Sequence, residues 1–405
     1  MSEGDERLDE VRAQARAIAP DLRSRALDVD AHPAQVARHV DSPGMRMVHA
    51  ISMGPAQPQP DRCRRLTVAT LEAARGDAGV LLASPGPSVA GVVVDLLADE
   101  AQRDRFRSAL ADGRSWAFCA ITEPQGGSDV LGLRTQLRHT PDGLRLSGSK
   151  LYVGNASRSR VGVVLARTGP SPLHIRAVLV PADAPGVVGS PLPMAGLRGA
   201  RIGRLTFTDV PVCEQDVLGA HLPPSRRGLW GAIRAFASVR VQVGAMAVAT
   251  AAAVCDYVTE HVTEHAAVRR DADLTAIRAR IAAAERLLLM AAAAVDRDEG
   301  RGQLSALAKV TATRLAIDVT TGLPARLGRG ALLDHPWLEK WRRDAAGFEF
   351  MEGTTAMQLL HVADGALRDP RNRGPADQPA QRTERRHDRV AGRGDLRAAG
   401  GASAE

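Results

Sequence analysis

Three short segments of the chain hold residues whose types and spacing could do chemistry. In RDAAGFEFMEGTTAMQ, residues 343–358, Glu352 stands at a Gly-Thr turn that opens a helix. A carboxylate at such a turn can act as a general base if burial raises its pKa towards the working range. A structural interpretation stays open, because the helix dipole favours an acid at a helix start and Thr354 could be a simple N-cap.

The second segment is AFCAITEPQGGSDVLGL, residues 117–133. A strand ending at Ile121 runs into a turn that contains Gly126 and Gly127. Backbone amides and small hydroxyl groups can approach a ligand closely at such a turn. An ordinary connection between two strands has the same composition, so this segment alone does not establish a binding site.

The third segment is LSGSKLYVGNAS, residues 146–157, where Tyr152 follows a strand and stands close to Gly154. An aromatic ring at the end of a strand can serve as a platform for a flat cofactor. A lone tyrosine at such a position is more often a packed aromatic residue than a cofactor platform.

The elements that must position these segments change in type along the chain. Residues 1–113 show apolar positions at helical spacing, 114–222 contain short alternating runs rich in Val, Leu and Ile, and helical patterning returns over 223–368. We therefore expect an α+β multidomain protein with an N-terminal α-helical domain, a middle β-barrel or sandwich domain and a C-terminal helical bundle. The bundle helices are expected at about 228–262, 273–298, 303–321 and 355–367, and 369–405 are expected to form a disordered tail.

Composition argues against several other classes of function. Only three of the 53 basic residues are lysines, so the excess of arginine is typical of a GC-rich coding sequence. Aromatic residues make up only 3% of the chain, which leaves few side chains to stack on bases, so nucleic-acid binding is not expected. The four cysteines are scattered without metal-ligand spacing, which predicts free thiols and no metal site. The acidic N-terminus and the short apolar run near 245–255 predict a cytoplasmic protein without a membrane segment.

Together, the three segments and the order helices, β domain, helices resemble the acyl-CoA dehydrogenase family up to about residue 368. LEAARGDAGVLLA, residues 71–83, and GLRGARIGRLTFTDVPVCEQDVLG, residues 196–219, add to the resemblance. It implies α,β-dehydrogenation of an acyl thioester, in which a carboxylate removes the α-proton and FAD accepts the β-hydride. The implied partners are acyl-CoA or an acyl-carrier protein, an electron-transfer flavoprotein or oxygen as electron acceptor, and further copies of the chain in a homodimer or homotetramer.

The resemblance also assigns roles by position. Glu352 matches the catalytic base, and its own amide would help to bind the thioester oxygen. Some relatives carry the base just before an arginine that matches Arg240, but Val239 precedes Arg240 here, so Glu352 is the only candidate of the two. The cofactor contacts carried over are Phe118, Ile121, Thr122, Gly127, Ser128, Tyr152 and Thr354, and the substrate contacts are Ser128, Phe236 and Arg240.

Several positions depart from the family pattern. His261 and Glu264 stand where relatives have an Arg and a Phe that reach the FAD of a neighbouring subunit, Pro324 stands near an expected Gln, and Gly154 replaces a Thr that reaches the flavin ring. Two hypotheses follow: a working flavoenzyme that binds FAD less tightly than its relatives, or a flavin-less relative that serves as a non-redox enzyme or binding subunit. We favour the flavoenzyme, because the base and the Thr/Gly/Ser turn persist together.

Overall fold

The computed structural model describes residues 3–55, 59–127, 130–262, 272–297 and 302–368. Met1–Gly365 form one compact unit and Ala366–Glu405 a second, and the architecture below is that of the first. The division of this unit into three domains stays a prediction. The tail expected at 369–405, and the predicted positions Ser128 and Glu264, lie outside the described residues.

The N-terminal part is helical, as its apolar spacing predicts. Helix starts here carry side-chain caps: Ser42 accepts from the Met45 amide, Asp77 from the Val80 amide, and Asp99 forms a capping box with Gln102. The helices are α1 (Glu3–Ala31), η1 (Pro33–His39), α2 (Pro43–Met53), α3 (Arg62–Ala73), α4 (Ala78–Ala83), α5 (Ser88–Leu97) and α6 (Glu100–Ser108).

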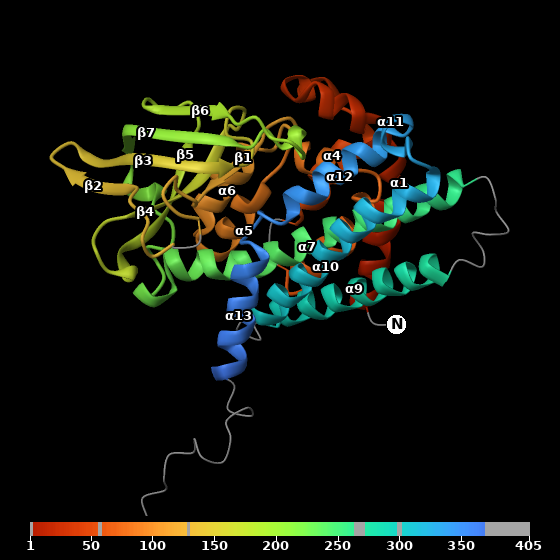
Figure 1. Cartoon of the computed structure of the whole chain (residues 1–405). Helices are drawn as coiled ribbons and strands as arrows, with labels where there is room; N and C mark the ends of the chain where they lie inside the picture. Colours follow the sequence, from red (N-terminus) through yellow and green to blue (C-terminus); the bar gives the residue numbers. More distant parts are fainter. Residues whose placement is uncertain (1–2, 56–58, 128–129, 263–271, 298–301, 369–405) are drawn as a thin grey trace, which may run out of the picture. The chain divides into compact units, whose positions relative to one another are not determined.

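The middle part is one curled sheet in which β5 pairs with β4 and the remaining strands follow the order β1-β4-β2-β3-β7-β6. β1 and β4 are parallel, whereas β3 pairs antiparallel with both β2 and β7 (Figure 1). The strands are β1 (Ala117–Ala120), β2 (Gln136–Thr140), β3 (Gly143–Val153), β4 (Val161–Arg167), β5 (Ile175–Pro181), β6 (Val187–Pro191) and β7 (Gly203–Val212), with η2 (Pro172–His174), η3 (Arg198–Ala200), η4 (Glu214–Asp216) and η5 (Pro224–Arg226) between or after them.

Both faces of β4 are buried, which explains its unbroken apolar sequence. Val163 and Leu165 pack on one side with residues of α5 and α7, whereas Val164 and Ala166 pack on the other side with the interior of the curled sheet. The same alternation along β1 places Phe118 inside the sheet and Cys119 towards the helices. The site therefore forms where this outer face of β1 meets the helical bundle.

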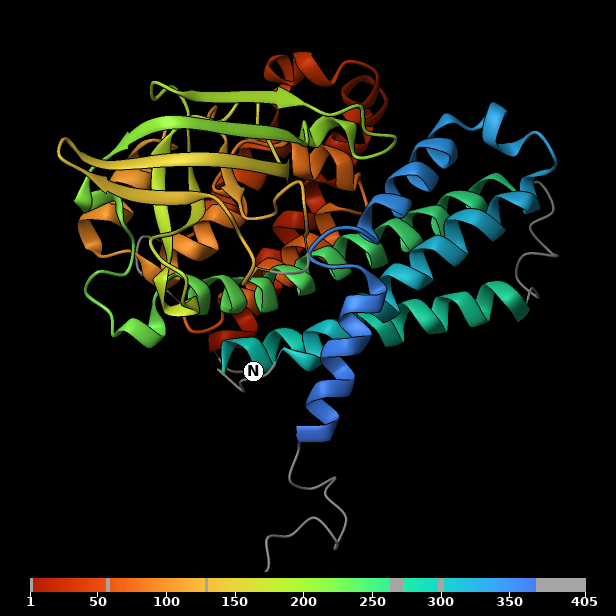
Figure 2. The same ribbon diagram turned by 60° about the vertical axis from the view of Figure 1, so that its left-hand side comes forward.

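The C-terminal part is a bundle built on α7 (Gly228–His261), α9 (Ala272–Asp296) and α10 (Gln303–Gly322). α7 begins beside β5 and continues into the bundle, next to α10 and α9 (Figures 1 and 2). The stretch 224–261 is apolar and long enough to cross a bilayer, but 83% of its most apolar window is buried inside the protein, as expected of a core helix. The four helices predicted for the bundle have ends within two residues of α7, α9, α10 and α13 (Thr355–Arg368), and the order helices, curled sheet, helices confirms the predicted fold class.

Four further elements follow α10: η6 (Leu323–Leu327), α11 (Ala331–Asp334), α12 (Pro336–Phe348) and α13 (Thr355–Arg368). A buried charge cluster attaches α12 to the rest of the unit. The Lys340 ammonium donates to both carboxylate oxygens of Asp77 at 2.8 and 2.7 Å and to Asp344 at 2.6 Å. Asp344 also accepts from the Leu197 amide at 2.6 Å. The cluster thus joins three parts of the unit, which are α4, α12 and the loop before η3.

Candidate active site

Glu352 lies in the turn between α12 and α13, and its backbone adopts the left-handed conformation with φ of 53°. A non-glycine residue is uncommon there, and such strain gathers at functional sites. Gly353 follows with φ of 97°, and a Cβ on it would lie 2.4 Å from Nε2 of Gln358. The φ of 97° therefore favours glycine directly after the acid.

Three side chains from three helices hold the backbone of this turn. Nζ of Lys309 on α10 donates to the carbonyl oxygens of Glu349 at 3.0 Å and Gly353 at 2.5 Å. Nε2 of Gln358 on α13 donates to the Glu352 carbonyl at 2.9 Å, and Nε of Arg240 on α7 reaches the same oxygen at 3.3 Å. The turn is therefore fixed from outside, since a short segment could not hold this conformation alone.

No side chain in the described part of the chain makes a hydrogen bond to the Glu352 carboxylate. Burial raises the pKa of this carboxylate, and the positive charges of Arg240 and Lys309 oppose that rise without cancelling it. Burial also raises the pKa of the Cys119 thiol, and the charge of Glu352 adds to the effect, so the two side chains lie near one another. A part-buried carboxylate with a raised pKa and no hydrogen bond from a described side chain is suited to accept a proton from a ligand.

The alternative role of Glu352 as a helix-start acid is filled by another residue. The Glu349 carboxylate accepts from the Thr355 amide at 2.7 Å and from its hydroxyl group at 2.6 Å, at the first turn of α13. Thr354, predicted as a cofactor contact or an N-cap, places its hydroxyl 3.5 Å from the Met357 amide. Both residues satisfy the helix start, which leaves the Glu352 side chain available.

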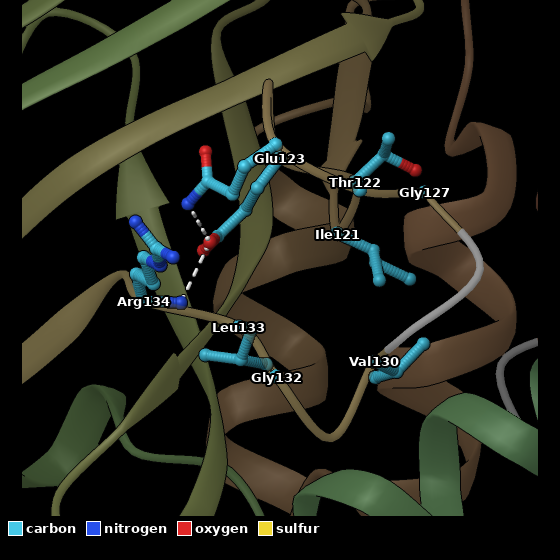
Figure 3. Close-up of a pocket in the computed structure, with 10 residues that line it drawn as sticks. Ile121, Thr122, Glu123, Gly127, Val130, Gly132, Leu133 and Arg134 are labelled. Carbon is cyan, nitrogen blue, oxygen red and sulfur yellow. Dashed lines mark hydrogen bonds between the residues drawn. The ribbon is translucent and has the colours of Figure 1, made fainter.

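The turn after β1 is fastened by Glu123 (Figure 3). Its carboxylate accepts from the Arg134 amide at 2.6 Å. It also accepts from the Thr135 amide and hydroxyl at 2.8 and 2.6 Å, and from Nζ of Lys150 at 2.9 Å. Burial raises the pKa of Glu123, but the hydrogen bonds from Thr135 and the charge of Lys150 outweigh burial and lower it. Glu123 is thus an ionised anchor that shapes the turn.

A cavity of about 160 Å³ lies within this turn, lined by residues that include the predicted contacts Ile121, Thr122 and Gly127 (Figure 3). Ligand pockets usually measure about 300–1,000 Å³, so this cavity can hold part of a cofactor-sized molecule. The Thr122 carbonyl accepts from the Leu151 amide at 2.9 Å, which brings the end of β3 beside the turn. The second and third sequence segments therefore meet.

Tyr152 follows Leu151 with φ of 57° and is 63% exposed. A large aromatic side chain that is open to solvent, in a strained backbone conformation beside a cavity, is typical of a ligand platform. A Cβ built on Gly154 or Gly126 meets no atom within 4 Å, so both glycines leave open space next to this ring and turn.

The remaining predicted contacts fall in different environments. Phe236 and Arg240 lie one turn apart on α7, with the guanidinium 5.7 Å from the ring centroid. Val239 is buried in the bundle core. Phe118, predicted as a cofactor contact, is fully buried inside the sheet, so its backbone, not its ring, faces the site.

Two positions that depart from the family pattern are occupied by other contacts. His261 stacks on Tyr257 at 3.9 Å between ring centroids and bonds the Tyr257 carbonyl oxygen at 2.8 Å through Nδ1. Pro324 is buried in η6. Neither residue offers a side chain that could replace the missing anion-binding arginine or the glutamine.

Comparison with known proteins identifies the family of this chain. The profile of the acyl-CoA dehydrogenase middle domain matches residues 118–210, and that of the C-terminal domain matches 226–367. The chain belongs to the acyl-CoA dehydrogenase family. This family member is 27% identical to the probable acyl-CoA dehydrogenase YngJ of Bacillus subtilis, over 66% of its own length and 73% of YngJ.

Two solved structures share the fold of this acyl-CoA dehydrogenase family member. PigA with FAD and proline superposes with a TM-score of 0.77 at 16% identity, covering 90% of this chain and 98% of PigA. The prolyl acyl carrier protein oxidase AnaB superposes with a TM-score of 0.75 at 20% identity, covering 88% of this chain and 98% of AnaB. The family consists of oxidoreductases that act on CH–CH groups, and the cofactor that it implies is FAD.

The described residues fit a flavin on the side of its ring. The exposed Tyr152, the turn hydroxyl of Thr122 and the open space at Gly126 and Gly154 form a cradle that a flat ring could enter. The side that would hold the adenosine of FAD has less support, since neither His261 nor Pro324 offers a guanidinium group or a side-chain amide there.

Sequence reasoning missed the residues that support the turn of the candidate base, Glu352. Lys309, Gln358 and Cys119 surround the Glu352 turn from α10, α13 and β1, at distances along the chain that no motif connects. One signal was available for Lys309, because it is one of only three lysines among 53 basic residues. A lysine kept in such a background marks a place where a compact ammonium is needed.

Proposed function

We propose that this protein catalyses the α,β-dehydrogenation of an acyl thioester carried by CoA or by an acyl-carrier protein. The observation that carries the proposal is the part-buried Glu352 carboxylate, which has a raised pKa and no hydrogen bond from any described side chain. A thioester carbonyl acidifies the α-carbon, so a carboxylate with a raised pKa is a suitable base. When bound, FAD supplies the acceptor for the hydride that leaves the β-carbon.

The residues of the chain have separate tasks in this proposal. Glu352 takes the α-proton onto its carboxylate, and Lys309, Gln358 and Arg240 keep its turn in place. Phe236, which lies one turn from Arg240 on α7, would shield the acyl chain from water. Tyr152, Thr122 and Gly127 would hold the flavin ring.

The proposal includes a homodimer or homotetramer. The cavity of about 160 Å³ is smaller than a whole FAD needs, so the rest of the cofactor would lie on an open surface that a second subunit could cover. An electron-transfer flavoprotein or oxygen as electron acceptor remains a prediction from the resemblance.

An absorbance spectrum with anaerobic reduction tests the proposal. We expect FAD to co-purify or to bind after incubation, and its visible band to bleach when an acyl thioester is added without oxygen. Purified protein that binds no FAD even at excess would overturn the flavoenzyme and favour the flavin-less binding subunit. A flavinated protein that no acyl-CoA or acyl-carrier thioester can bleach would contradict the reaction.

A further inference from the structure

Three segments of the chain that meet beside the candidate site carry positive charge without any acidic residue. Residues 130–141, 161–182 and 217–255 contain eight arginines and neither Asp nor Glu. This imbalance far exceeds that of the whole chain, where 46 acids accompany 53 basic residues. A local excess of this kind attracts a partner of opposite charge.

Contacts bring the three segments together at the start of α7. Nη2 of Arg167 donates to the Leu131 carbonyl at 3.2 Å, and Arg167 pairs with Ile175 in the β4–β5 ladder. Gly228, the first residue of α7, packs so tightly on β5 that a Cβ on it would lie 2.2 Å from the Ile175 carbonyl oxygen. The segments therefore form one continuous surface.

Four of the arginines on this surface, Arg167, Arg176, Arg226 and Arg227, make contacts other than salt bridges. Arg167 and Arg176 donate to backbone carbonyl oxygens, and Arg226 lies 6.0 Å from the Trp230 ring centroid. Burial, followed by the nearby charge of Arg227, lowers the pKa of Arg176. None of these four arginines forms a salt bridge within the described ranges, so their charges remain available to a partner.

Exposed aliphatic side chains lie among the arginines. Leu131 is 51% exposed, Leu173 54% and Ile233 57%. We call the surface formed by Leu131, Arg167, Leu173, Arg176, Arg226 and Ile233 the basic patch. A nucleotide could bind the charges but would leave the aliphatic side chains in water, whereas an acidic protein surface with apolar residues could cover both.

The basic patch adjoins the entrance to the candidate site. Leu131 stands between Val130 and Gly132, which line the cavity. Ile233 precedes Arg240 by seven residues on α7, which is about 10 Å at a rise of 1.5 Å per residue. A partner on the patch could therefore present a substrate on a flexible arm to the Glu352 turn.

We propose that the basic patch is the docking surface for an acidic acyl-carrier protein that delivers its acyl group on a pantetheine thioester. This rests on the proposed dehydrogenation of an acyl thioester and selects the carrier protein as its source. A second copy of the chain is a poor occupant, because a symmetric contact would place the uncompensated arginines of two copies against each other.

A binding measurement that requires no turnover tests the docking surface. The probe is an acidic acyl-carrier protein of the fatty-acid synthase type, carrying a butyryl-pantetheine thioester, titrated into the full chain at low and at high salt. We expect Arg226→Glu combined with Leu173→Asp to raise the Kd by at least about tenfold, and binding of the unaltered chain to weaken as salt rises. Arg204→Glu, the same charge change at an exposed residue of β7, is the matched control and should leave the Kd unchanged.

Four results would overturn the docking surface: no binding of the carrier, equal binding by the double variant, equal loss in Arg204→Glu, or binding of anionic lipid vesicles in place of the carrier. Thermal unfolding of each variant shows whether it is folded. Reduction of the unaltered flavoprotein by butyryl-CoA reports separately on the reaction. A protein that binds the carrier through the patch but reduces no flavin would keep the docking surface and reject the dehydrogenation.

Discussion

Nζ of Lys309 lies 2.5 Å from the carbonyl oxygen of Gly353, the residue that follows the candidate base. The same ammonium donates to the Glu349 carbonyl at 3.0 Å, so one side chain from α10 spans the turn that carries Glu352. Burial lowers the pKa of Lys309 to about 8, although the charges of Glu349 and Glu352 oppose the shift. Lys309 is therefore a positioning residue whose charge also acts on the base.

Replacing Lys309 with Met should loosen the turn and remove a titration. Two part-buried carbonyl groups, of Glu349 and Gly353, lose their donor, which should lower the free energy of unfolding by about 1–3 kcal/mol. Because the folded pKa of about 8 lies below the ordinary value of 10.5, the stability of the unaltered protein should rise with pH between these values. Denaturant unfolding at several pH values checks both points, and a variant that keeps the same pH-dependent rise would contradict the assignment.

Glu352→Gln should abolish proton abstraction while keeping the shape of the site. An amide cannot accept the α-proton, so thioester-driven flavin reduction should fall by at least about a hundredfold. Flavin content should stay the same, since the side chain makes no hydrogen bond to any described side chain. Single-turnover reduction by stopped flow measures the change, and an unchanged rate in a fully flavinated variant would remove Glu352 from the mechanism.

Arg240→Gln should move the pH dependence of that reduction. The base must be ionised, so the rate rises with pH through its pKa, which burial raises and Arg240 lowers. Loss of the guanidinium should therefore shift the acid limb to higher pH. Arg240→Lys keeps the charge and is the matched control; if both variants shift equally, the effect comes from the lost hydrogen bond to the Glu352 carbonyl instead of from charge.

Gly154→Thr should tighten the binding of FAD. A Cβ at this position meets no atom within 4 Å, so the larger side chain has room. One recovered hydrogen bond contributes about 0.5–1.5 kcal/mol, or roughly two- to twelvefold in Kd. Gly154→Val has nearly the same shape without the hydroxyl group; fluorescence titration with FAD should show a gain for Thr alone, and equal affinity in both variants would refute the hydrogen bond.

Lys340→Met should destabilise the fold without touching the site. Two buried carboxylates, Asp77 and Asp344, would lose their shared ammonium, and breaking a buried pair costs about 3–5 kcal/mol. Denaturant unfolding should show this loss, while Arg204→Met on the surface should show almost none. A loss below about 1 kcal/mol would mean that the cluster is not held as ions.

Local pattern was sufficient to predict the long helices, because α7, α9 and α10 each repeat apolar residues over many turns. It did not predict α12, a thirteen-residue helix that starts at Pro336 and is held by the buried Lys340 cluster. Short elements of this kind depend on tertiary contacts that no spacing encodes.

The sequence likewise predicted part of the candidate site and missed the rest. The Gly-Thr turn marked Glu352 as a candidate base from the sequence, but the support from Lys309 and Gln358 arises only when α10 and α13 pack around that turn. On β1, the predicted contact Phe118 faces the sheet interior and its neighbour Cys119 faces the site. Neighbouring residues of a strand point to opposite faces of the sheet, so a shift of one residue exchanges the two faces. Only the curvature of the sheet shows which face is its interior.

The three lysines of the chain are all buried: Lys150 and Lys309 have no exposed surface, and Lys340 has 2%. No ε-amino group of the native protein is thus open to an amine-directed reagent. Each lysine reports on a different contact. Lys150 on β3 binds Glu123, Lys309 binds the turn that carries Glu352, and Lys340 binds Asp77 where α4 meets α12. Under rising denaturant, the order in which the three become acylated would record which of these regions opens first.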